Sequence, residues 1–592
     1  MADIAGKLVR ISGPMIAADG MLGVAMGEMV KVGKLGLMGE VIRIDGETAY
    51  AQVYEDTSGM FLGEPVVAQG APLSIELGPG LLGQTYDGIQ RPLIDLQKTS
   101  GDFIDRGLSA DPLDYTKKWA FTPKAAVGQE VTGGDYLGSV PETEYLDHNI
   151  MVPPGVSGKI KTIVGTGEYT VQETIATLED GTELTMTHKW PVKLPRPFKK
   201  KLPMNQPFIT GQRVLDMLFP IALGGSAIVP GGFGTGKTVV EQQISKFCNA
   251  DIIVYVGCGE RGNEMADVLD EFPKLRDPKT GGPLMNRMIL VVNTSNMPVA
   301  AREASVYTGI TLGEYYRDQG YSVAMMADST SRWAEALREI SSRLEEMPGE
   351  EGYPTYLSTR TAEFYERAGR VDCIGTITKG DEGRRGSLTL VGAVSPPGGD
   401  FSEPVTQNSM RVAGGFWALD AKLAYSRHYP AINWNMSYSL YLNDLDSWFR
   451  ENAPAGWMEN RQKAVDLLQR DTELQEIVQL VGPDALQEHE RLVLEMARMV
   501  KETFLQQNAF SDDDAYSSLD KTGHLIEALM LFYAECESAL SAGVTLESIL
   551  SHPIREEVSR LRELNPEGFV EKKEKVVQEM KAALQGLVEK AA

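Results

Sequence analysis

The chain has 592 residues, of which 42% are hydrophobic and 23% charged, and its formal net charge is −25. This length is too great for one hydrophobic core and predicts about three to five globular domains. The acidic balance argues against a nucleic-acid partner, because such a partner selects a basic surface.

The small number of cysteines also excludes some classes of protein. There are 4, widely spaced and without a CxxC pair, which excludes a disulfide framework and a cysteine-based zinc site. We therefore expect a reducing, cytoplasmic compartment. The N-terminus lacks the apolar core of a signal peptide, and no run of about 18 apolar residues occurs, so we expect no membrane-spanning segment.

Residues 1–75 contain short runs in which apolar and polar residues roughly alternate, separated by glycine-rich turns. The runs are Leu8–Ile11, Met29–Val32, Gly39–Ile44 and Tyr50–Tyr54. An alternation with period two is typical of strands that are buried on one face. We predict a small antiparallel β-barrel, with a two-sheet sandwich as the alternative.

Residues 76–114 begin with a glycine-rich stretch and are expected to form a linker into the core. From 115 to 195 the chain returns to short strand-like runs with glycine turns, among them Val127–Val131, Asp135–Val140 and Gly158–Val164. This stretch has the size of a small domain, and we interpret it as a β-rich insertion.

From 196 to 435 the pattern changes to strands that alternate with helices. Short apolar runs occur at Ala227–Val229, Ile252–Val256, Met288–Val292 and Ser322–Ala327. They lack clear alternation, as expected for strands buried on both faces of a parallel sheet. The helices between them are expected to be amphipathic, for example Ala300–Arg317. The sequence predicts an α/β core.

Helices dominate from 436 to 592, where glycine is rare. Apolar residues recur at helical spacing, for example from Leu525 to Tyr533 and from Ile554 to Leu564 after Pro553. We predict an α-helical domain whose last segment, 567–592, is a solvated amphipathic helix rich in Lys and Glu.

One stretch of the core carries a recognisable chemical pattern. It fits G-x-x-x-x-G-K-[ST] and consists of Gly231, Gly232, Phe233, Gly234, Thr235, Gly236, Lys237 and Thr238, followed by Val239. A predicted strand precedes it and a predicted helix follows it, so backbone N–H groups and a helix N-terminus converge on one point. A chance match has a probability of roughly 0.04. The pattern predicts a nucleotide site in which Lys237 reaches the β- and γ-phosphates and Thr238 offers its hydroxyl to magnesium.

Two other strand ends carry charged residues suited to phosphate chemistry. Asp328 follows a buried strand and could hold a magnesium-bound water, as a Walker B residue does; the alternative is an N-cap for the next helix. Glu260 and Arg261 follow a Gly-Cys-Gly turn where a second strand ends. Glu260 could polarise the attacking water and Arg261 could steady the γ-phosphate, whereas a surface ion pair is the alternative.

Several long motifs together resemble one family, the catalytic A subunits of V-type/A-type rotary ATPases. They are the phosphate loop, Gly257–Glu264, Met326–Glu339, Glu346–Pro354 and Ser395–Asp400. The resemblance covers nearly the whole chain and includes the β insertion, which the related F-type β subunit lacks. It implies a multidomain α/β protein with an N-terminal β-barrel, the insertion, a P-loop (RecA-like) core and a C-terminal helical bundle.

The resemblance also implies an activity and its partners. The activity is ATP hydrolysis or synthesis, with Mg²⁺ and ATP/ADP, coupled to H⁺ or Na⁺ transport. The partners are a homologous non-catalytic B subunit, which alternates with this chain in an A3B3 hexamer and supplies a transition-state arginine, and the central and peripheral stalks. Attachment to the membrane ring would be indirect, on the cytoplasmic face, and no nucleic acid is expected.

Carried over by motif, the resemblance implies roles for single residues. Lys237 and Thr238 bind phosphate and magnesium, Glu260 activates water beside Arg261, and Asp328 holds magnesium through water. The segment from Phe504 to Phe510 resembles the adenine side of the site, with Phe510 and Tyr429 packing on the base; plain core packing is the alternative for such aromatic residues. Eukaryotic relatives carry cysteine at the position of Thr235, and its absence here favours a prokaryotic source.

Two rival functions follow from the same sequence. The first is a nucleotide-binding structural subunit without turnover, against which the intact Lys237, Thr238 and Glu260 argue. The second is a secretion-type or helicase-type hexameric ATPase. The acidic composition disfavours a nucleic-acid substrate, and the β insertion disfavours the secretion type.

Overall fold

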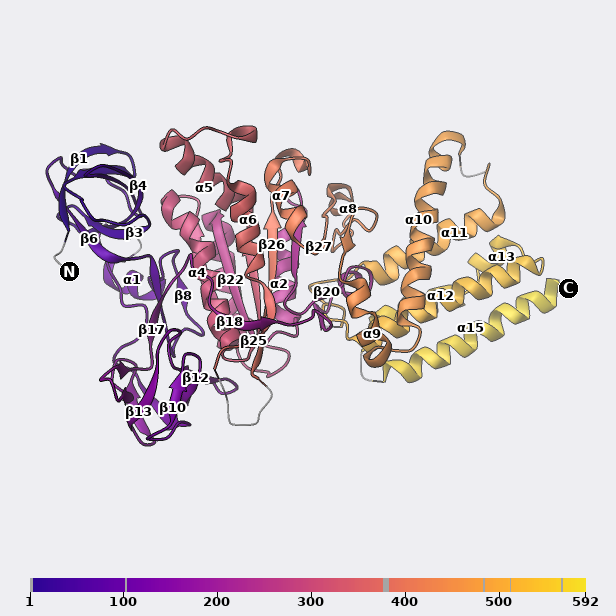
Figure 1. Ribbon diagram of the computed structural model, residues 1–592. Coiled ribbons are helices and arrows are strands. Elements are labelled where there is room, and N and C mark those ends of the chain that lie inside the picture. Colours follow the sequence, from indigo (N-terminus) through magenta and orange to yellow (C-terminus); the bar gives the residue numbers. More distant parts are fainter. Residues whose placement is uncertain are drawn as a thin grey trace. The chain divides into compact units, whose positions relative to one another are not determined.

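The structure is a computed structural model that describes residues 4–101, 104–375, 383–482, 485–511, 513–565 and 568–591. The chain forms two compact units. The first holds the chain up to Pro203 together with Ala250–Pro396 and Phe401–Val412, and the second holds Met204–Asn249, Pro397–Asp400 and the chain from Ala413 onward. Figure 1 labels the elements of both.

The first unit begins with a closed six-stranded barrel, visible in Figure 1, whose strands follow the order β1-β2-β5-β4-β3-β6. The strands are β1 (Ala5–Ser12), β2 (Met15–Asp19), β3 (Glu28–Val32), β4 (Leu37–Asp45), β5 (Thr48–Val53) and β6 (Pro65–Pro72). Apolar side chains such as Leu8, Val30 and Val53 fill its interior. Closure into a barrel leaves no free sheet edge, and it confirms the predicted barrel over the sandwich.

The β-rich insertion forms two four-stranded sheets, with the orders β10-β13-β15-β16 and β12-β11-β9-β14. The strands are β9 (Lys118–Pro123), β10 (Glu130–Thr132), β11 (Tyr136–Pro141), β12 (Asp147–Met151), β13 (Ser157–Ile163), β14 (Gly167–Thr170), β15 (Ala176–Leu178) and β16 (Glu183–Leu184). A shared hydrophobic cluster around Phe121, Leu137 and Leu178 packs between the sheets. The insertion therefore has a core of its own.

The segment expected to be a linker contains ordered elements. They are β7 (Ser74–Leu77), β8 (Thr85–Tyr86) and helix α1 (Leu93–Ser100). Strand β7 pairs antiparallel with β17 (His188–Pro191), where the insertion ends, and β8 pairs parallel with β23 of the core sheet. The chain thus ties the insertion and the core sheet together at this segment.

Parallel strands form the core sheet of the first unit, in the order β26-β24-β22-β23-β8. They are β22 (Ile252–Glu260), β23 (Met288–Thr294), β24 (Ser322–Asp328) and β26 (Arg385–Val394), and β25 (Gly369–Cys373) and β18 (Phe198–Lys201) add antiparallel pairs beside β26. Parallel pairing aligns the carboxyl ends of β22, β23 and β24 at one edge, as the apolar runs predicted.

Helix α4 (Val299–Asp318) packs on β22, β23, β24 and β26. We predicted an amphipathic helix here, and that was wrong, because nearly every residue of α4 is buried, including Glu303, Glu314 and Arg317. A helix enclosed on all sides has no solvent-facing stripe. The polar residues that suggested such a stripe are instead paired inside the protein.

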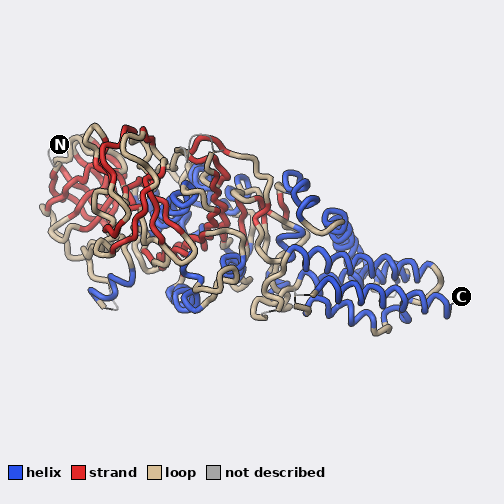
Figure 2. The backbone as a smooth tube through the Cα atoms, turned by 90° about the horizontal axis from the view of Figure 1, so that it is seen from below, coloured by secondary structure: helices blue, strands red, loops and turns tan. Residues whose placement is uncertain are grey.

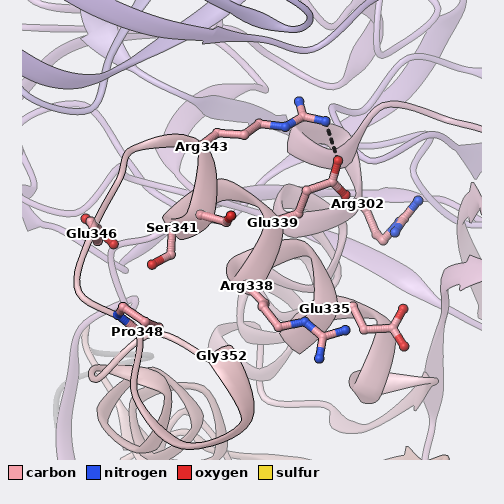
Figure 3. Close-up of a pocket in the computed structure, with 10 residues that line it drawn as sticks. Arg302, Glu335, Arg338, Glu339, Ser341, Arg343, Glu346, Pro348 and Gly352 are labelled. Carbon is pink, nitrogen blue, oxygen red and sulfur yellow. Dashed lines mark hydrogen bonds and ion pairs between the residues drawn. The ribbon is translucent and has the colours of Figure 1, made fainter.

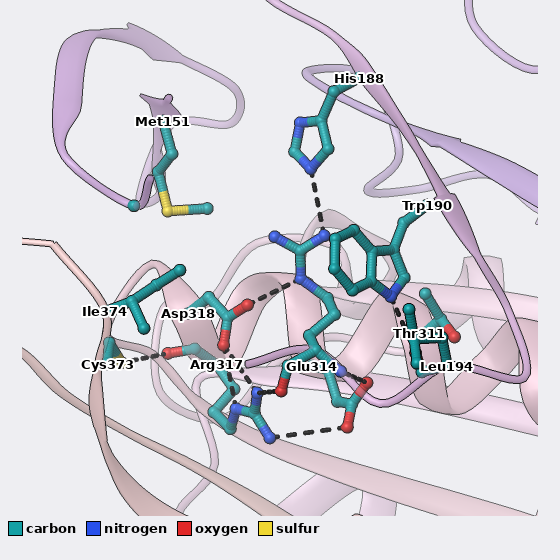
Figure 4. Close-up of polar contacts among 12 residues, drawn as sticks. Met151, His188, Trp190, Leu194, Thr311, Glu314, Arg317, Asp318, Cys373 and Ile374 are labelled. Carbon is teal, nitrogen blue, oxygen red and sulfur yellow. Dashed lines mark hydrogen bonds and ion pairs between the residues drawn. The ribbon is translucent and has the colours of Figure 1, made fainter. Parts of the chain in front are cut away.

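A buried network of charges fixes the end of the insertion to α4 (Figure 4). Arg196 donates from Nε to Asp318 Oδ2 at 2.7 Å, and Arg317 donates from Nη2 to Asp318 Oδ1 at 2.8 Å. His188 Nε2 lies 3.1 Å from Arg196 Nη1. Burial and the neighbouring guanidinium hold the pKa of His188 well below its usual range, so the imidazole stays neutral and can accept that hydrogen bond.

The remaining helices of the first unit cover the sheet or extend from its edge. They are α3 (Gly262–Glu271), α5 (Thr330–Arg343), α6 (Leu357–Glu366) and α7 (Pro404–Val412), with short turns at η2 (Phe272–Lys274), η3 (Leu284–Arg287) and η4 (Glu350–Gly352). Helix α5 packs on α4, β22 and β26. It leads directly from the carboxyl end of β24.

The second unit contains a small set of strands and the helix that carries the phosphate loop. Strand β21 (Ser226–Pro230) pairs parallel with β27 (Gly415–Phe416), which pairs antiparallel with β28 (Tyr438–Ser439). Strands β19 (Pro207–Phe208) and β20 (Ile221–Ala222) flank the π-helical turn η1 (Val214–Leu218), α2 spans Lys237–Phe247, and η5 spans Pro397–Gly399.

The C-terminal part of this unit is helical, as the run of blue helices in Figure 2 shows. Its elements are α8 (Ala421–Tyr425), α9 (Leu442–Asn452), α10 (Trp457–Val481), α11 (Glu488–Val500), η7 (Lys501–Leu505), α12 (Leu519–Ser541), α13 (Leu546–Leu550), α14 (Ile554–Arg560), η8 (Leu561–Glu563) and α15 (Phe569–Ala591). The predicted helical domain is confirmed. No helix in the described part of the chain is both long and apolar enough to cross a bilayer.

Candidate functional site: a phosphate loop and a carboxylate edge

The loop Gly231–Thr238 connects β21 to α2 within the second unit. Gly234 and Gly236 have φ values of 76° and 92°, a left-handed conformation that glycine adopts without strain. Lys237 is the first residue of α2. The loop therefore has the strand–loop–helix context that the pattern requires.

Gly231 is needed for a different reason, namely close packing. A Cβ at this position would lie 2.6 Å from Thr235 Oγ1 and 2.7 Å from Leu419 Cβ. The Thr235 hydroxyl in turn donates to the Gly232 carbonyl at 2.8 Å. Any larger residue at 231 would displace the loop backbone.

The loop fits a polyphosphate with magnesium. The Lys237 ammonium donates to the carbonyls of Gly231 at 2.8 Å and Gly232 at 3.0 Å, so Nζ folds back over the loop. The helix N-terminus favours negative charge at the same point. Thr238 is half-buried in the first turn of α2, and its hydroxyl is a hard oxygen ligand of the kind magnesium prefers.

Tyr429 lies beside the loop, and Phe504 and Phe510 belong to the same unit. The ring of Tyr429 would be 3.7 Å from a Cβ on Gly236, and Tyr429 is 41% exposed. Phe510 is 90% exposed, whereas Phe504 is fully buried. Tyr429 and Phe510 thus present ring surface to solvent and Phe504 does not.

Acidic side chains gather at the carboxyl edge of the core sheet in the first unit. Glu260 ends β22, Asp328 ends β24, and Glu260 is paired in register with Thr294 at the end of β23. Tyr255 donates its hydroxyl to Asp328 Oδ2 at 3.0 Å. Parallel strands bring together side chains that are 68 positions apart in the sequence, counting from 260 to 328.

The segment before Glu260 differs from the prediction. We expected a Gly-Cys-Gly turn after Val256, but β22 continues to Glu260 and is buried throughout. The register shifts between Cys258 and Glu260, and Gly259 has φ 68°. A bulge of this kind redirects the side chain that follows it, and here that side chain is Glu260.

Glu260 is only 8% exposed and carries a strongly perturbed carboxyl. Burial, the negative charge of Asp328 and a hydrogen bond with Glu264 raise the pKa of Glu260 to about 9, while Arg332 opposes that rise. In the ligand-free chain at pH 7 the carboxyl therefore retains its proton. Perturbation by burial and by a specific charge partner at a sheet edge marks a candidate catalytic group.

Arg261, Glu264 and Arg332 surround this carboxyl in different ways. Arg261 is exposed and precedes the first residue of α3, and Glu264 stands in the first turn of that helix. Arg332 on α5 donates to both carboxylate oxygens of Glu335, at 2.9 and 2.8 Å. We did not single out Glu264 or Arg332 from the sequence, although both lie in motifs that we used.

A cavity of about 700 Å³ lies along α5 in the first unit (Figure 3). Arg302, Arg338, Ser341 and Glu346 are among its lining residues. Cationic and acidic side chains alternate there, and Arg343 pairs with Glu339. Its mixed charge does not select an anion in the way that the phosphate loop does.

The candidate residues thus fall into two groups. Glu260, Arg261 and Asp328 belong to the first unit, and the phosphate loop, Val239, Tyr429, Phe504 and Phe510 belong to the second. Within the described residues, no group of three or more His, Cys, Asp or Glu side chains could hold a metal ion on its own.

Family models match four successive parts of the chain. They describe the β-barrel domain of the ATP synthase alpha/beta family at residues 8–70, the alpha/beta subunit barrel-sandwich domain at 110–193, the nucleotide-binding domain of that family at 211–439, and the C-terminal domain of V and A type ATP synthase at 446–550. The phosphate loop, Glu260 and Asp328 all lie within the third match. The segment from Phe504 to Phe510 lies within the fourth.

Curated relatives match over nearly their full length. The A subunit of the A-type ATP synthase of Methanopyrus kandleri is 56% identical and covers 100% of this chain and 99% of its own. Its counterpart in Thermococcus kodakarensis is 57% identical over 94% of this chain and 95% of its own. The V-type ATP synthase alpha chain of Thermoanaerobacter pseudethanolicus is 55% identical over 99% of both.

A solved structure shares the fold at lower identity. It is the assembled ATPase EscN from the type III secretion system of enteropathogenic E. coli, with a TM-score of 0.61 and 22% identity over 89% of this chain and 99% of that one. Identity of this order speaks for the fold alone. The full-length relatives decide the finer assignment, and the chain belongs to the ATP synthase alpha/beta family, among the A subunits of A-type and V-type ATP synthases.

Proposed function

We propose that this chain is the catalytic subunit of a rotary A-type or V-type ATPase, which hydrolyses or synthesises ATP coupled to H⁺ or Na⁺ transport across a membrane. The observation that carries the proposal is the geometry of the phosphate loop, with left-handed Gly234 and Gly236 leading into Lys237 at the start of α2. The relatives named as A subunits of A-type ATP synthases support it.

Binding of the phosphates falls to the loop. The backbone N–H groups of 232–238 and the Lys237 ammonium hold the β- and γ-phosphates, and Lys237 exchanges its loop carbonyls for phosphate oxygens. Thr238 and, through water, Asp328 would hold Mg²⁺, which would supply positive charge against the negative phosphates. Tyr255 keeps Asp328 oriented through its 3.0 Å hydrogen bond.

Activation of water falls to Glu260. Its carboxyl orients the attacking water in line with the γ-phosphate and takes up the proton, with Arg261 beside it. A pKa near 9 means that the group must first lose a proton. An arginine supplied by the neighbouring protein lowers that pKa, because a nearby positive charge favours the carboxylate. Ionisation of Glu260 is thereby linked to assembly of the complete site.

The base side of the site is formed by Tyr429 and Phe510, whose exposed rings suit stacking on adenine. Phe504 is buried, and we propose that its ring anchors the segment Phe504–Phe510 in the core. The main partners are three B subunits that alternate with three copies of this chain, and the two stalks. Through them the complex attaches to a membrane ring on the cytoplasmic face.

Two rival functions are disfavoured by specific observations. A non-catalytic structural subunit would bind nucleotide without turnover, and the buried, perturbed Glu260 favours catalysis instead. A secretion-type ATPase shares the fold, but the full-length relatives are named ATP synthase subunits.

Substitution of Glu260 by glutamine tests the catalytic assignment. In the complex reconstituted with its B partner, Glu260→Gln is expected to keep MgATP binding and to lose hydrolysis by about a hundredfold or more. Glu271→Gln, at an exposed position at the end of α3, serves as control. Turnover close to that of the unmodified complex would remove Glu260 from the mechanism.

Addition of the B partner tests the role of the neighbouring protein. The purified chain alone should hydrolyse ATP poorly, because the transition-state arginine comes from its neighbour. Hydrolysis should rise sharply when the B partner is added. No increase on assembly would contradict a shared active site.

A further inference from the structure

We propose that Arg213 is a positioning residue that sets the affinity of the site for the base of the nucleotide. It does so by fixing the segment Phe504–Phe510 against Tyr429. The inference rests on the proposed function, since it concerns the same nucleotide site. It adds a residue that contacts neither phosphate nor base.

Arg213 is 0% exposed, and its guanidinium contacts this segment and Asp514, which follows the segment in the chain. Nε donates to the Phe504 carbonyl at 2.8 Å and Nη2 to the Gln506 carbonyl at 2.7 Å. Nη1 donates to Asp514 Oδ1 at 2.6 Å. The arginine therefore contacts residues on both sides of Phe510 in the chain, and its ion pair with Asp514 holds the residues that follow Phe510.

The backbone of Arg213 adds a fourth connection. Its N–H donates to Gln507 Oε1 at 2.9 Å, and Gln507 Nε2 donates back to the Gly211 carbonyl at 2.9 Å. The Gln507 side chain thus both accepts and donates a hydrogen bond with the backbone of this turn. A planar fork of donors that meets several acceptors at once is a geometry that lysine cannot reproduce.

The segment reaches the phosphate loop through Tyr429. The Gln507 N–H donates to the Tyr429 carbonyl at 2.8 Å, and Gln506 Nε2 donates to the Arg427 carbonyl at 3.3 Å. The Tyr429 ring lies 3.7 Å from the Cβ position of Gly236. One continuous set of contacts, which begins at Arg213, therefore fixes the spacing between the aromatic residues that face the base and the loop that holds the phosphates.

The turn that carries Arg213 is itself rigid. Asp216 accepts hydrogen bonds from Thr210 N at 2.8 Å, Thr210 Oγ1 at 2.7 Å and Gly211 N at 2.8 Å. A Cβ on Gly211 would lie 2.5 Å from the ring of Tyr516, which stacks on Phe247 at the end of α2. The helix that starts at the phosphate loop thus ends against the same turn.

These contacts predict a selective effect of changing Arg213. Lysine keeps the charge but can donate to only some of the hydrogen-bond acceptors of the guanidinium. The segment Phe504–Phe510 therefore becomes less ordered where it contacts the base. The phosphate loop keeps its own bonds from Thr235 and Lys237 to Gly231 and Gly232. The loss should therefore fall on ligands with a base and spare ligands without one.

Calorimetric titration of the purified full chain with MgATP, MgGTP and magnesium tripolyphosphate tests the proposal. Arg213→Lys should weaken MgATP by about tenfold, bring the ATP and GTP affinities closer together, and leave tripolyphosphate within about twofold. The matched control is Arg461→Lys. Arg461 lies on α10 of the same unit and donates to the Leu218 carbonyl at 2.9 Å, and this variant should change none of the three affinities.

Asp514→Asn provides a second variant that keeps the shape of the ion pair and removes its charge. If Arg213→Lys does not fold, we expect Asp514→Asn to weaken MgATP binding and to spare tripolyphosphate in the same way. Equal loss of ATP and tripolyphosphate, or no loss of either, in a folded variant would overturn the positioning role. Failure of the unmodified chain to bind both ATP and tripolyphosphate would instead refute the proposed function itself.

Discussion

Replacing Glu260 by glutamine should stabilise the folded chain while it removes turnover. The pKa of this carboxyl is about 9 in the fold, against an ordinary value of 4.5. Between these values the unfolded chain releases the proton and the folded chain keeps it, so the free energy of unfolding falls as pH rises. At 1.36 kcal/mol per pKa unit, the cost of burying this group is roughly 1 kcal/mol at pH 5 and roughly 5 kcal/mol at pH 8.

Glutamine does not titrate, so Glu260→Gln escapes this cost. The variant should gain little stability over the unmodified chain at pH 5, and the gain should grow by about 4 kcal/mol towards pH 8. Hydrogen exchange of the β22 and β24 amides is the suitable assay, because it reports the opening of the core sheet in a chain of several domains. A gain that is absent, or equal at both pH values, would refute the reasoning from burial and from Asp328.

Four further substitutions test other parts of the account. Lys237→Ala should abolish MgATP binding in a calorimetric titration, whereas Lys246→Ala at the far end of α2 should not. Gly231→Ala should weaken MgATP and tripolyphosphate alike, because the added methyl group displaces the loop. Phe510→Ala should weaken MgATP by about tenfold and spare tripolyphosphate, since stacking on a base contributes about 1–3 kcal/mol. Asp318→Asn should lower the free energy of unfolding by about 3–5 kcal/mol in denaturant titrations, because it removes the charge partner of the buried Arg196 guanidinium.

Each of these has a result that would count against it. Nucleotide affinity retained in Lys237→Ala would remove the loop from the site, and tripolyphosphate binding unchanged in Gly231→Ala would show that the loop tolerates a side chain. Equal losses of both ligands in Phe510→Ala would argue that this ring supports the fold rather than the base. An unchanged free energy of unfolding in the Asp318→Asn variant would show that solvent reaches the buried charge network around Asp318.

The sequence predicted the elements that local pattern controls. Apolar runs located β21, β22, β23 and β24, because strands buried on both faces are apolar throughout. Alternation located four of the barrel strands, β1, β3, β4 and β5, but not β2 and β6. The phosphate loop could be identified from its spacing alone, since glycine and lysine at those positions follow from the chemistry of binding phosphate.

Other features depend on contacts that no local pattern records. We expected helix α4 to be amphipathic, but the partners of Glu303 and Glu314 come from distant segments and the helix is buried. The extension of β22 through Gly259 follows from pairing with β23 rather than from local propensity. Arg213 gave no signal because the acceptors of its guanidinium lie between 291 and 301 positions further along the chain.

A structure of the complex with its B partner, MgADP and a γ-phosphate mimic would test the central claim most directly. The account predicts the β-phosphate on the backbone amides of the loop and on Lys237 Nζ, the base between Tyr429 and Phe510, and the Glu260 carboxylate on the water that faces the mimic. A nucleotide bound elsewhere, or a Glu260 carboxylate directed away from that water, would contradict it.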